Sequence, residues 1–310
     1  MGAITATAIS HVVIETADVA RARRFYAEIL GAPANFGAFP DLGPNGAACR
    51  LPSGQYLALA QAAAPRTFAD TAVHVAYRAA PEAVAAIVGR AGAAGISVHR
   101  YVEDRPQEVK DNIYFADPDG NRIQLVAAHG PATGIDGIDH CAALISDIEW
   151  EDDYWVETIG LRAAHRVGWA TQDFVRARAW GEGKEDMAPG TRRWDQRYRD
   201  IPGARPGQER KVARPNPQLF LEFAGAGQGP VVGLFLAQSH LQEPPPEQTR
   251  GSPRIGLTVA DTALDDLPRA LAGAGTRVEG PVRHAGGGPL LRSVYLRDRC
   301  GVFFEFCSRA

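Results

Sequence analysis

Two polar side chains, Gln124 and Glu305, stand inside strand-like runs that are otherwise apolar. They occupy the same place in two copies of one motif, 117–125 and 298–306, which reads as a tight turn followed by a strand. Asp-Pro-Asp-Gly in the first copy is a turn signal, because proline presets φ and glycine accepts a positive φ. A polar group inside an apolar strand is costly unless another group pairs with it. The motif therefore indicates that each of these side chains has a partner elsewhere in the fold.

Three histidines open strand-like runs. His11 and His140 do so 129 residues apart, at matching positions of an internal repeat, and His74 opens a further run between them. A single histidine at such a position is most simply a hydrogen-bonded core residue. Its recurrence at matching positions of the repeat favours a functional role over a structural one.

The second half of the chain repeats the first, and internal repeats constrain a fold strongly. Segments 25–31 and 154–160 align at the same offset as the two histidines, whereas later pairs are offset by 177 to 181 residues. The change in offset predicts an insertion at about 165–215. We expect two tandem domains, at 6–128 and 136–308, which is also the number that the length of 310 residues suggests.

Hydrophobic periodicity alternates between 2 and 3.6 along each half, so each quarter reads as a strand, a helix and two or three short strands. The pattern predicts an α+β fold. In the first half we expect strands at 8–14, 72–78, 96–102, 111–116 and 122–127 and helices at 17–30 and 81–93, and in the second half a first helix at 147–159.

Composition excludes several classes of partner. The net charge is −3 and the pI is near 6.3, so neither nucleic acid nor a membrane surface is an expected partner. No run of about 18 apolar residues is present, and the N-terminus lacks the pattern of a signal peptide. The four cysteines lack metal-finger spacing and read as reduced thiols, which favours a cytoplasmic protein.

The predicted insertion is rich in arginine and aromatic residues, among them Trp194 and Tyr198. Such a segment can bind an anionic or aromatic ligand by charge and stacking. The alternative is a solvated surface excursion, because long loops are either functional or loosely structured.

The ordered set of strand-start histidines, the Asp-Pro-Asp-Gly turn and the polar residue after it, found twice, resembles the vicinal oxygen chelate superfamily. The resemblance covers 8–127 well and 137–307 apart from the insertion. It implies paired βαβββ modules that form an open barrel around a divalent metal.

The family's three ligand positions fall on His11, His74 and Gln124 in the first half and on His140, Arg254 and Glu305 in the second. Some family members exchange modules between domains. Exchange would group His140 with His74 and Gln124, and would leave His11 with Arg254 and Glu305; exchange between chains would give a homodimer.

Two imidazoles and one oxygen ligand on one face of a metal leave positions for a chelating substrate and oxygen. We therefore expect the site with His74 and Gln124 to hold a divalent metal, Fe(II) or Mn(II), with His11 or His140 as its third ligand. Arg254 beside Glu305 can instead form an ion pair in the place of a metal. That second site is then structural or a substrate pocket.

The resemblance implies three hypotheses for the function. The first is a ring-cleaving, extradiol-like dioxygenase that acts on a catechol-like or other vicinal-oxygen aromatic. The second is a glyoxalase- or epimerase-like lyase or isomerase, with Glu305 as a base. The third is a metal-free binding protein that confers resistance to an aromatic natural product. Tyr114, as a proton donor, and His284, as a general acid or base, are further candidates.

Overall fold

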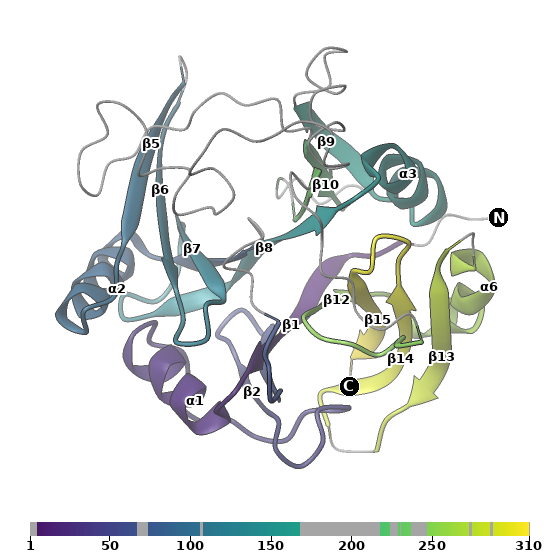
Figure 1. Ribbon diagram of the computed structural model, residues 1–310, viewed down its shortest axis with the longest axis horizontal. Helices are drawn as coiled ribbons and strands as arrows, with labels where there is room; N and C mark the ends of the chain where they lie inside the picture. The colour runs from purple at the N-terminus through teal and green to yellow at the C-terminus, as the bar shows by residue number, and fades with distance from the viewer. Residues whose placement is uncertain are drawn as a thin grey trace.

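The computed structural model of the chain describes residues 5–66, 74–105, 108–167, 218–223, 229, 231–236, 247–272, 275–285 and 288–309. Four modules of strands and helices follow one another along it (Figure 1). The first module consists of β1 (Ala8–Thr16), α1 (Val19–Glu28), β2 (Ala47–Arg50) and β3 (Tyr56–Gln61); the second of β4 (Val75–Ala79), α2 (Pro81–Ala93), β5 (His99–Arg105), β6 (Glu108–Ala116) and β7 (Arg122–Ala127). The third consists of β8 (Ile135–Ile145), α3 (Ile148–Asp153), the π-helix η1 (Tyr154–Thr158), β9 (Arg162–Val167), β10 (Gln218–Glu222) and β11 (Val232–Leu236); the fourth of β12 (Arg254–Thr258), the 3-10 helix η2 (Asp261–Asp265), α6 (Leu267–Leu271), β13 (Arg277–Arg283), β14 (Leu290–Arg297) and β15 (Phe303–Arg309).

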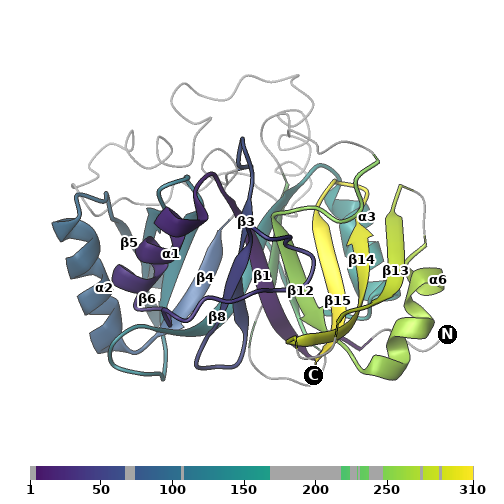
Figure 2. The same cartoon turned by 90° about the horizontal axis from the view of Figure 1, so that it is seen from below.

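The strands form two sheets that lie side by side (Figure 2). Sheet A has seven strands in the order β13-β14-β15-β12-β1-β3-β2, and sheet B has eight in the order β5-β6-β7-β4-β8-β11-β10-β9. Sheet A therefore joins the first module to the fourth, and sheet B joins the second to the third. In each sheet the two modules meet through one antiparallel pair, β1 with β12 and β4 with β8.

Equivalent aspartates begin the first helix of each half. The side chain of Asp18 accepts a hydrogen bond from the backbone N–H of Arg21 at the start of α1, and that of Asp147 accepts one from Trp150 at the start of α3. Such caps satisfy N–H groups that have no partner inside the helix. The caps therefore fix where both helices start, two residues and one residue later than the periodicity predicts.

Each of these helices also contacts the glycine turn of a module in the other sheet. On α1, the hydroxyl of Tyr26 donates to Asp117 in the turn between β6 and β7, over 3.2 Å. On the equivalent helix of the other half, the buried carboxyl of Glu151 interacts with that of Asp298 in the turn between β14 and β15. The repeated turns thus hold the two sheets together, in addition to shaping the hairpins.

The apolar residues form one large core and one smaller cluster. The large core packs the helices against both sheets and includes the fully buried Trp155, whose ring centre lies 4.3 Å from that of Phe304. The smaller cluster lies on one face of sheet A and consists of Val13, Phe39, Ala48, Ala58, Leu290 and Cys307.

The α+β fold of paired modules that the sequence predicts is confirmed, and α2 has the predicted bounds. The ranges 6–128 and 136–308 remain a prediction for domains; each of them contributes one module to each sheet. The predicted insertion falls almost entirely outside the described residues, as do Trp194 and Tyr198. Among the helices that the structure describes, none has the length and apolar character that crossing a membrane requires.

Candidate functional site

The first candidate site lies on three adjacent strands of sheet B. Ala76 on β4 is paired with Gln124 on β7 and with His140 on β8, so these three residues form one row across the sheet. His74 lies two residues before Ala76. Because side chains alternate between the two faces of a strand, His74 shares the face of this row. The topology thus explains how three distant residues meet.

The three polar side chains of this set converge on one point. The Nε2 atoms of His74 and His140 lie 3.0 Å apart, and the Nε2 atom of His140 lies 3.1 Å from the Oε1 atom of Gln124. Each atom can present a lone pair, so their approach is favourable where a proton or a cation stands between them. We name this set, His74, Gln124 and His140, the sheet B triad.

Two neighbours hold the sheet B triad in place. The Oδ1 atom of Asp139 lies 2.7 Å from the Nδ1 atom of His140, which leaves the Nε2 atom of that ring directed at the other two residues. Tyr114 on β6 stands opposite Gln124, and its ring packs edge-on against that of His74 at 5.6 Å. About a quarter of the Asp139 side chain is exposed to solvent, whereas His74 is buried. The triad therefore lies between the core and the surface.

The second candidate site repeats this arrangement in sheet A. Gly256 on β12 is paired with His11 on β1 and with Glu305 on β15, and Arg254 lies two residues before it. A Cβ atom on Gly256 would lie 2.2 Å from the His11 ring, so only glycine leaves room for that ring. We name the set His11, Arg254 and Glu305 the sheet A triad.

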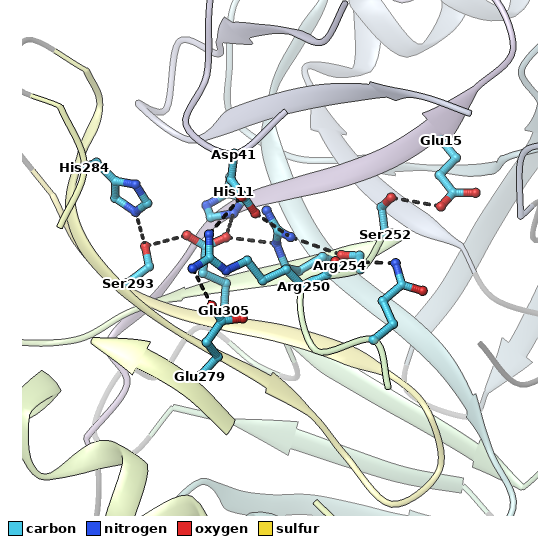
Figure 3. A network of polar contacts seen from close by, with 12 residues as sticks. His11, Glu15, Asp41, Arg250, Ser252, Arg254, Glu279, His284, Ser293 and Glu305 are labelled. Atoms are coloured by element: carbon cyan, nitrogen blue, oxygen red, sulfur yellow. Dashed lines mark hydrogen bonds and ion pairs between the residues drawn. The ribbon is translucent and has the colours of Figure 1, made fainter. Parts of the chain in front are cut away.

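In the sheet A triad an ion pair stands at the centre (Figure 3). The Oε2 atom of Glu305 lies 2.9 Å from the Nε atom of Arg254 and 3.1 Å from the Nε2 atom of His11. Ser293 donates to the Oε1 atom over 2.6 Å. Burial alone raises the pKa of a carboxyl, but the charge of Arg254 and the contact with His11 outweigh it and lower the pKa of Glu305 to about 2. Glu305 is consequently a poor base at neutral pH.

A second layer of polar groups surrounds this ion pair. The Nε2 atom of His284 lies 2.7 Å from the Oγ atom of Ser293, and burial lowers the pKa of His284. Asp41 lies between two arginines, with one oxygen 3.5 Å from Arg254 and the other 3.2 Å from Arg250. His284 therefore belongs to the sheet A triad's surroundings, and not to those of the sheet B triad.

Comparisons with known proteins agree with this architecture. Residues 8–125 match the family model of the Glyoxalase/Bleomycin resistance protein/Dioxygenase superfamily. A putative dioxygenase from Bacillus subtilis subsp. subtilis str. 168 is 17% identical, and the match covers 99% of this chain and 86% of that chain with a TM-score of 0.61. Residues 8–125 are therefore similar to this superfamily, and over the rest of the chain the solved structures show a shared fold alone. Glyoxalase I from Zea mays shares the fold at 12% identity, with 97% of this chain and 92% of that chain covered and a TM-score of 0.57. No curated protein sequence matches the chain.

Within this superfamily fold, the exchanged grouping of the ligand positions is the one that the structure contains. His11 was an alternative third ligand beside His74, but this assignment needs correction, because the pairing of β1 with β12 places His11 against Glu305 and Arg254. His140 takes that place through the pairing of β4 with β8.

Sequence reasoning does not identify the residues behind the ligand positions, although a local signal exists. Asp139 directly precedes His140, and Ser10 directly precedes His11 at the matching position of the repeat. Both contact the Nδ1 atom of the following histidine, at 2.7 and 3.2 Å. A polar residue directly before each of the two repeated histidines could have identified both.

The donor atoms of the two triads differ in their fit to a metal. Two ligands at about 2.1 Å from one metal and at right angles lie about 3.0 Å apart, close to the distances in the sheet B triad. In the sheet A triad the guanidinium of Arg254 already supplies the positive charge. Among the described residues, no three His, Cys, Asp or Glu side chains come together in a way that could hold a metal ion. The sheet B triad has two imidazoles, and its third donor is a neutral amide.

Proposed function

We propose that the protein is a metal-dependent enzyme of the vicinal oxygen chelate type that uses the sheet B triad, and that it cleaves the ring of a catechol-like aromatic. The observation that carries this proposal is the convergence of the Nε2 atoms of His74 and His140 and the Oε1 atom of Gln124 within 3.0 and 3.1 Å. Two imidazoles and an oxygen on one face suit Fe(II) or Mn(II) and leave open positions. His74, His140 and Gln124 would hold the metal, which would supply Lewis-acid activation of two neighbouring substrate oxygens.

The protein's own residues favour an anionic substrate. Gln124 is neutral, so a divalent cation at the sheet B triad would keep more of its charge than one beside a carboxylate. A substrate with two negative oxygens compensates that charge better than a neutral one does. Asp139 orients His140, and Tyr114, whose ring packs against His74, is the candidate proton donor at the same face.

A second candidate is a proton-transfer reaction of the glyoxalase or epimerase kind at the same triad. Such a reaction needs a base near the substrate. Glu305 is a poor choice, since its pKa lies near 2 and it is held by Arg254 in the other sheet. His284 is likewise placed beside the sheet A triad. The absence of a suitable base from these two positions favours the dioxygenase proposal over the proton-transfer one.

The test begins with elemental analysis of the purified protein. We expect about one iron or manganese per chain, lost in His74→Ala and His140→Ala and retained in His129→Ala, which changes an exposed histidine. Oxygen consumption with a catechol panel would then support ring cleavage. Exchange of solvent deuterium into a ketone substrate without oxygen consumption would support the second candidate. Ligand binding without turnover, unaffected by a chelator, would replace both by a metal-free binding protein.

A further inference from the structure

Three buried hydrogen-bond donors near the sheet A triad have no hydrogen-bond partner within the described part of the chain. They are the Nη2 atom of Arg254, the Nε atom of Arg250 and the hydroxyl of Tyr295. Arg254 is 3% exposed and Tyr295 is 0% exposed. A buried donor without a partner costs about 1–3 kcal/mol. Stability alone would not favour three of them in one place, so the arrangement points to a missing acceptor.

The two guanidinium groups lie close to the aromatic ring that carries the third donor. The guanidinium carbon of Arg254 lies 5.0 Å from the ring centre of Tyr295, and that of Arg250 lies 4.8 Å from it. The Nε atom of Arg254 makes no hydrogen bond of good geometry, but it lies 2.9 Å from Glu305 as an ion pair. The Nη1 atom of Arg254 donates to the carbonyl oxygen of Gly251. Figure 3 shows the two arginines close together, with Glu305 beside them.

The position of these donors repeats that of the sheet B triad. Tyr295 stands opposite Glu305 on β14 and β15, as Tyr114 stands opposite Gln124 on β6 and β7. The donors therefore lie at the level of sheet A that matches the proposed substrate site of sheet B. In sheet A, however, the guanidinium of Arg254 supplies a positive charge, whereas the sheet B triad presents only lone pairs. A ligand could therefore bind at sheet A without a metal.

The chemistry of the three donors selects the class of ligand. All of them donate and two belong to cations, so a protonated amine would oppose donor to donor, and an alcohol would offer a single neutral acceptor oxygen. A carboxylate accepts through both oxygens and prefers charged donors. The three carboxylates of Glu305, Asp41 and Glu279 exceed the two arginines by one negative charge, so direct hydrogen bonds, and not net charge, would hold the ligand.

Apolar side chains on the same face suit the rest of such a ligand. Val13 and Cys307 lie two residues beyond His11 and Glu305 on their strands, and Phe39 packs against the His11 ring at 5.0 Å. We propose that Arg254, Arg250 and Tyr295 form a second ligand site, independent of metal, that binds a small aromatic or apolar carboxylate. This site does not depend on the proposed ring cleavage.

The test uses the full chain and benzoate as the probe, with EDTA present throughout, and follows binding by calorimetry. We expect saturable binding of benzoate and at least tenfold weaker binding of benzamide, which has the same shape but carries an NH2 donor in place of one acceptor oxygen. Tyr295→Phe should bind benzoate at least fivefold more weakly and keep or raise the melting temperature, because it removes a buried hydroxyl without a partner. Arg254→Lys, which keeps a cation beside Glu305 but removes the Nη2 donor, should also bind more weakly.

Tyr114→Phe is the matched control, since it makes the same change at the equivalent position of sheet B. It should bind benzoate as the wild type does. The proposal is overturned if the wild type shows no saturable binding, if benzamide binds equally well, or if Tyr295→Phe leaves the affinity unchanged. Because EDTA removes divalent metal, a failure of the metal analysis would end the ring-cleavage proposal and leave this result untouched.

Discussion

At the scale of single residues, the two triads differ most at one position. Gln124 and Glu305 have the same place in the repeat, but one is a neutral amide that faces imidazoles and the other is a carboxylate that faces a guanidinium. A carboxylate adds a full negative charge to a metal site, whereas an amide oxygen adds only a dipole. The charge of this residue would therefore set how strongly the sheet B triad holds the proposed divalent cation.

Gln124→Glu should raise the affinity for Fe(II) or Mn(II) at least tenfold, because the new side chain has the same size and carries the charge. Titration against a competing chelator measures this change. Gln61→Glu, at an exposed position at the end of β3, is the control and should leave the affinity unchanged. An affinity that Gln124→Glu does not change would mean that Gln124 is not a ligand.

Asp139 would orient the proposed metal ligand His140 from behind. Asp139→Asn should lower the metal affinity about 10–100-fold, since second-layer partners of metal-binding histidines have effects of that size. Ser10→Ala is the matched control, because Ser10 contacts the Nδ1 atom of His11 at the equivalent position. Metal content should be unchanged in that variant; a loss in Ser10→Ala equal to that in Asp139→Asn would place the metal elsewhere.

At the scale of elements, the contact between α3 and the turn from β14 to β15 contains a pH-dependent pair. Glu151 and Asp298 are both fully buried, and the N–H of Val302 donates to Asp298 over 2.8 Å. Burial raises the pKa of Asp298 to about 7 and raises that of Glu151, which is also opposed by the charge of Asp298. Trp155 donates to the Oε2 atom of Glu151 over 2.7 Å, which leaves the Oε1 atom of Glu151 and the Oδ2 atom of Asp298 without a donor in the described part of the chain. We expect one shared proton to hold these two oxygens together.

Because of this pair, we expect the free energy of unfolding to fall as the pH rises. Between about pH 4 and pH 7 the folded state binds more protons than the unfolded state, so the free energy of unfolding decreases by up to about 1.4 kcal/mol per pH unit for one proton. Asp298→Asn should reduce this slope and be more stable than the wild type at pH 8, since an amide can donate to Glu151. Urea unfolding at several pH values measures both effects.

The equivalent contact in the other half provides the contrast. Asp117 accepts from the hydroxyl of Tyr26 and from the backbone N–H groups of Asp119 and Asn121. Each of these hydrogen-bond partners in the described part of the chain is a donor. Asp117→Asn would turn an amide N–H toward those donors and should destabilise the protein at every pH. If both variants lost stability equally at pH 8, the shared proton between Glu151 and Asp298 would be ruled out.

The elements show what local sequence can and cannot predict. Periodicity located α2 and β7 with the correct bounds, because side-chain alternation is a property of one segment. It left open whether His11 or His140 joins His74. That choice depends on which strand edge pairs with β4, and both β1 and β8 are apolar strands that begin a repeat. Asp139 was missed because its role depends on the orientation of the His140 ring, and the sequence does not give that orientation.

At the scale of the whole molecule, the sheets divide the chain differently from the repeat. The first half of the sequence supplies β1 to sheet A and β4 to sheet B, and each of these strands pairs with a strand of the second half, β12 or β8. In the repeat, β12 is equivalent to β4 and β8 is equivalent to β1. The edges of β1 and β4, both in the first half, are therefore suited to pair with each other. A fragment of residues 1–131 would leave both edges unpaired, which favours association.

We therefore expect the fragment of residues 1–131 to form a symmetric homodimer in which β1 of one copy pairs with β4 of the other. Such an interface uses the same two edges in both copies and closes on itself. Each site of the dimer would combine His11 from one copy with His74 and Gln124 from the other. Sedimentation measures the oligomeric state, for which we expect a dimer. Metal analysis should find up to two metals per dimer, and none in the fragment with His11→Ala. A folded, monomeric fragment would show instead that the range 6–128 forms a domain by itself, and that the exchange seen in the full chain is not required by the module.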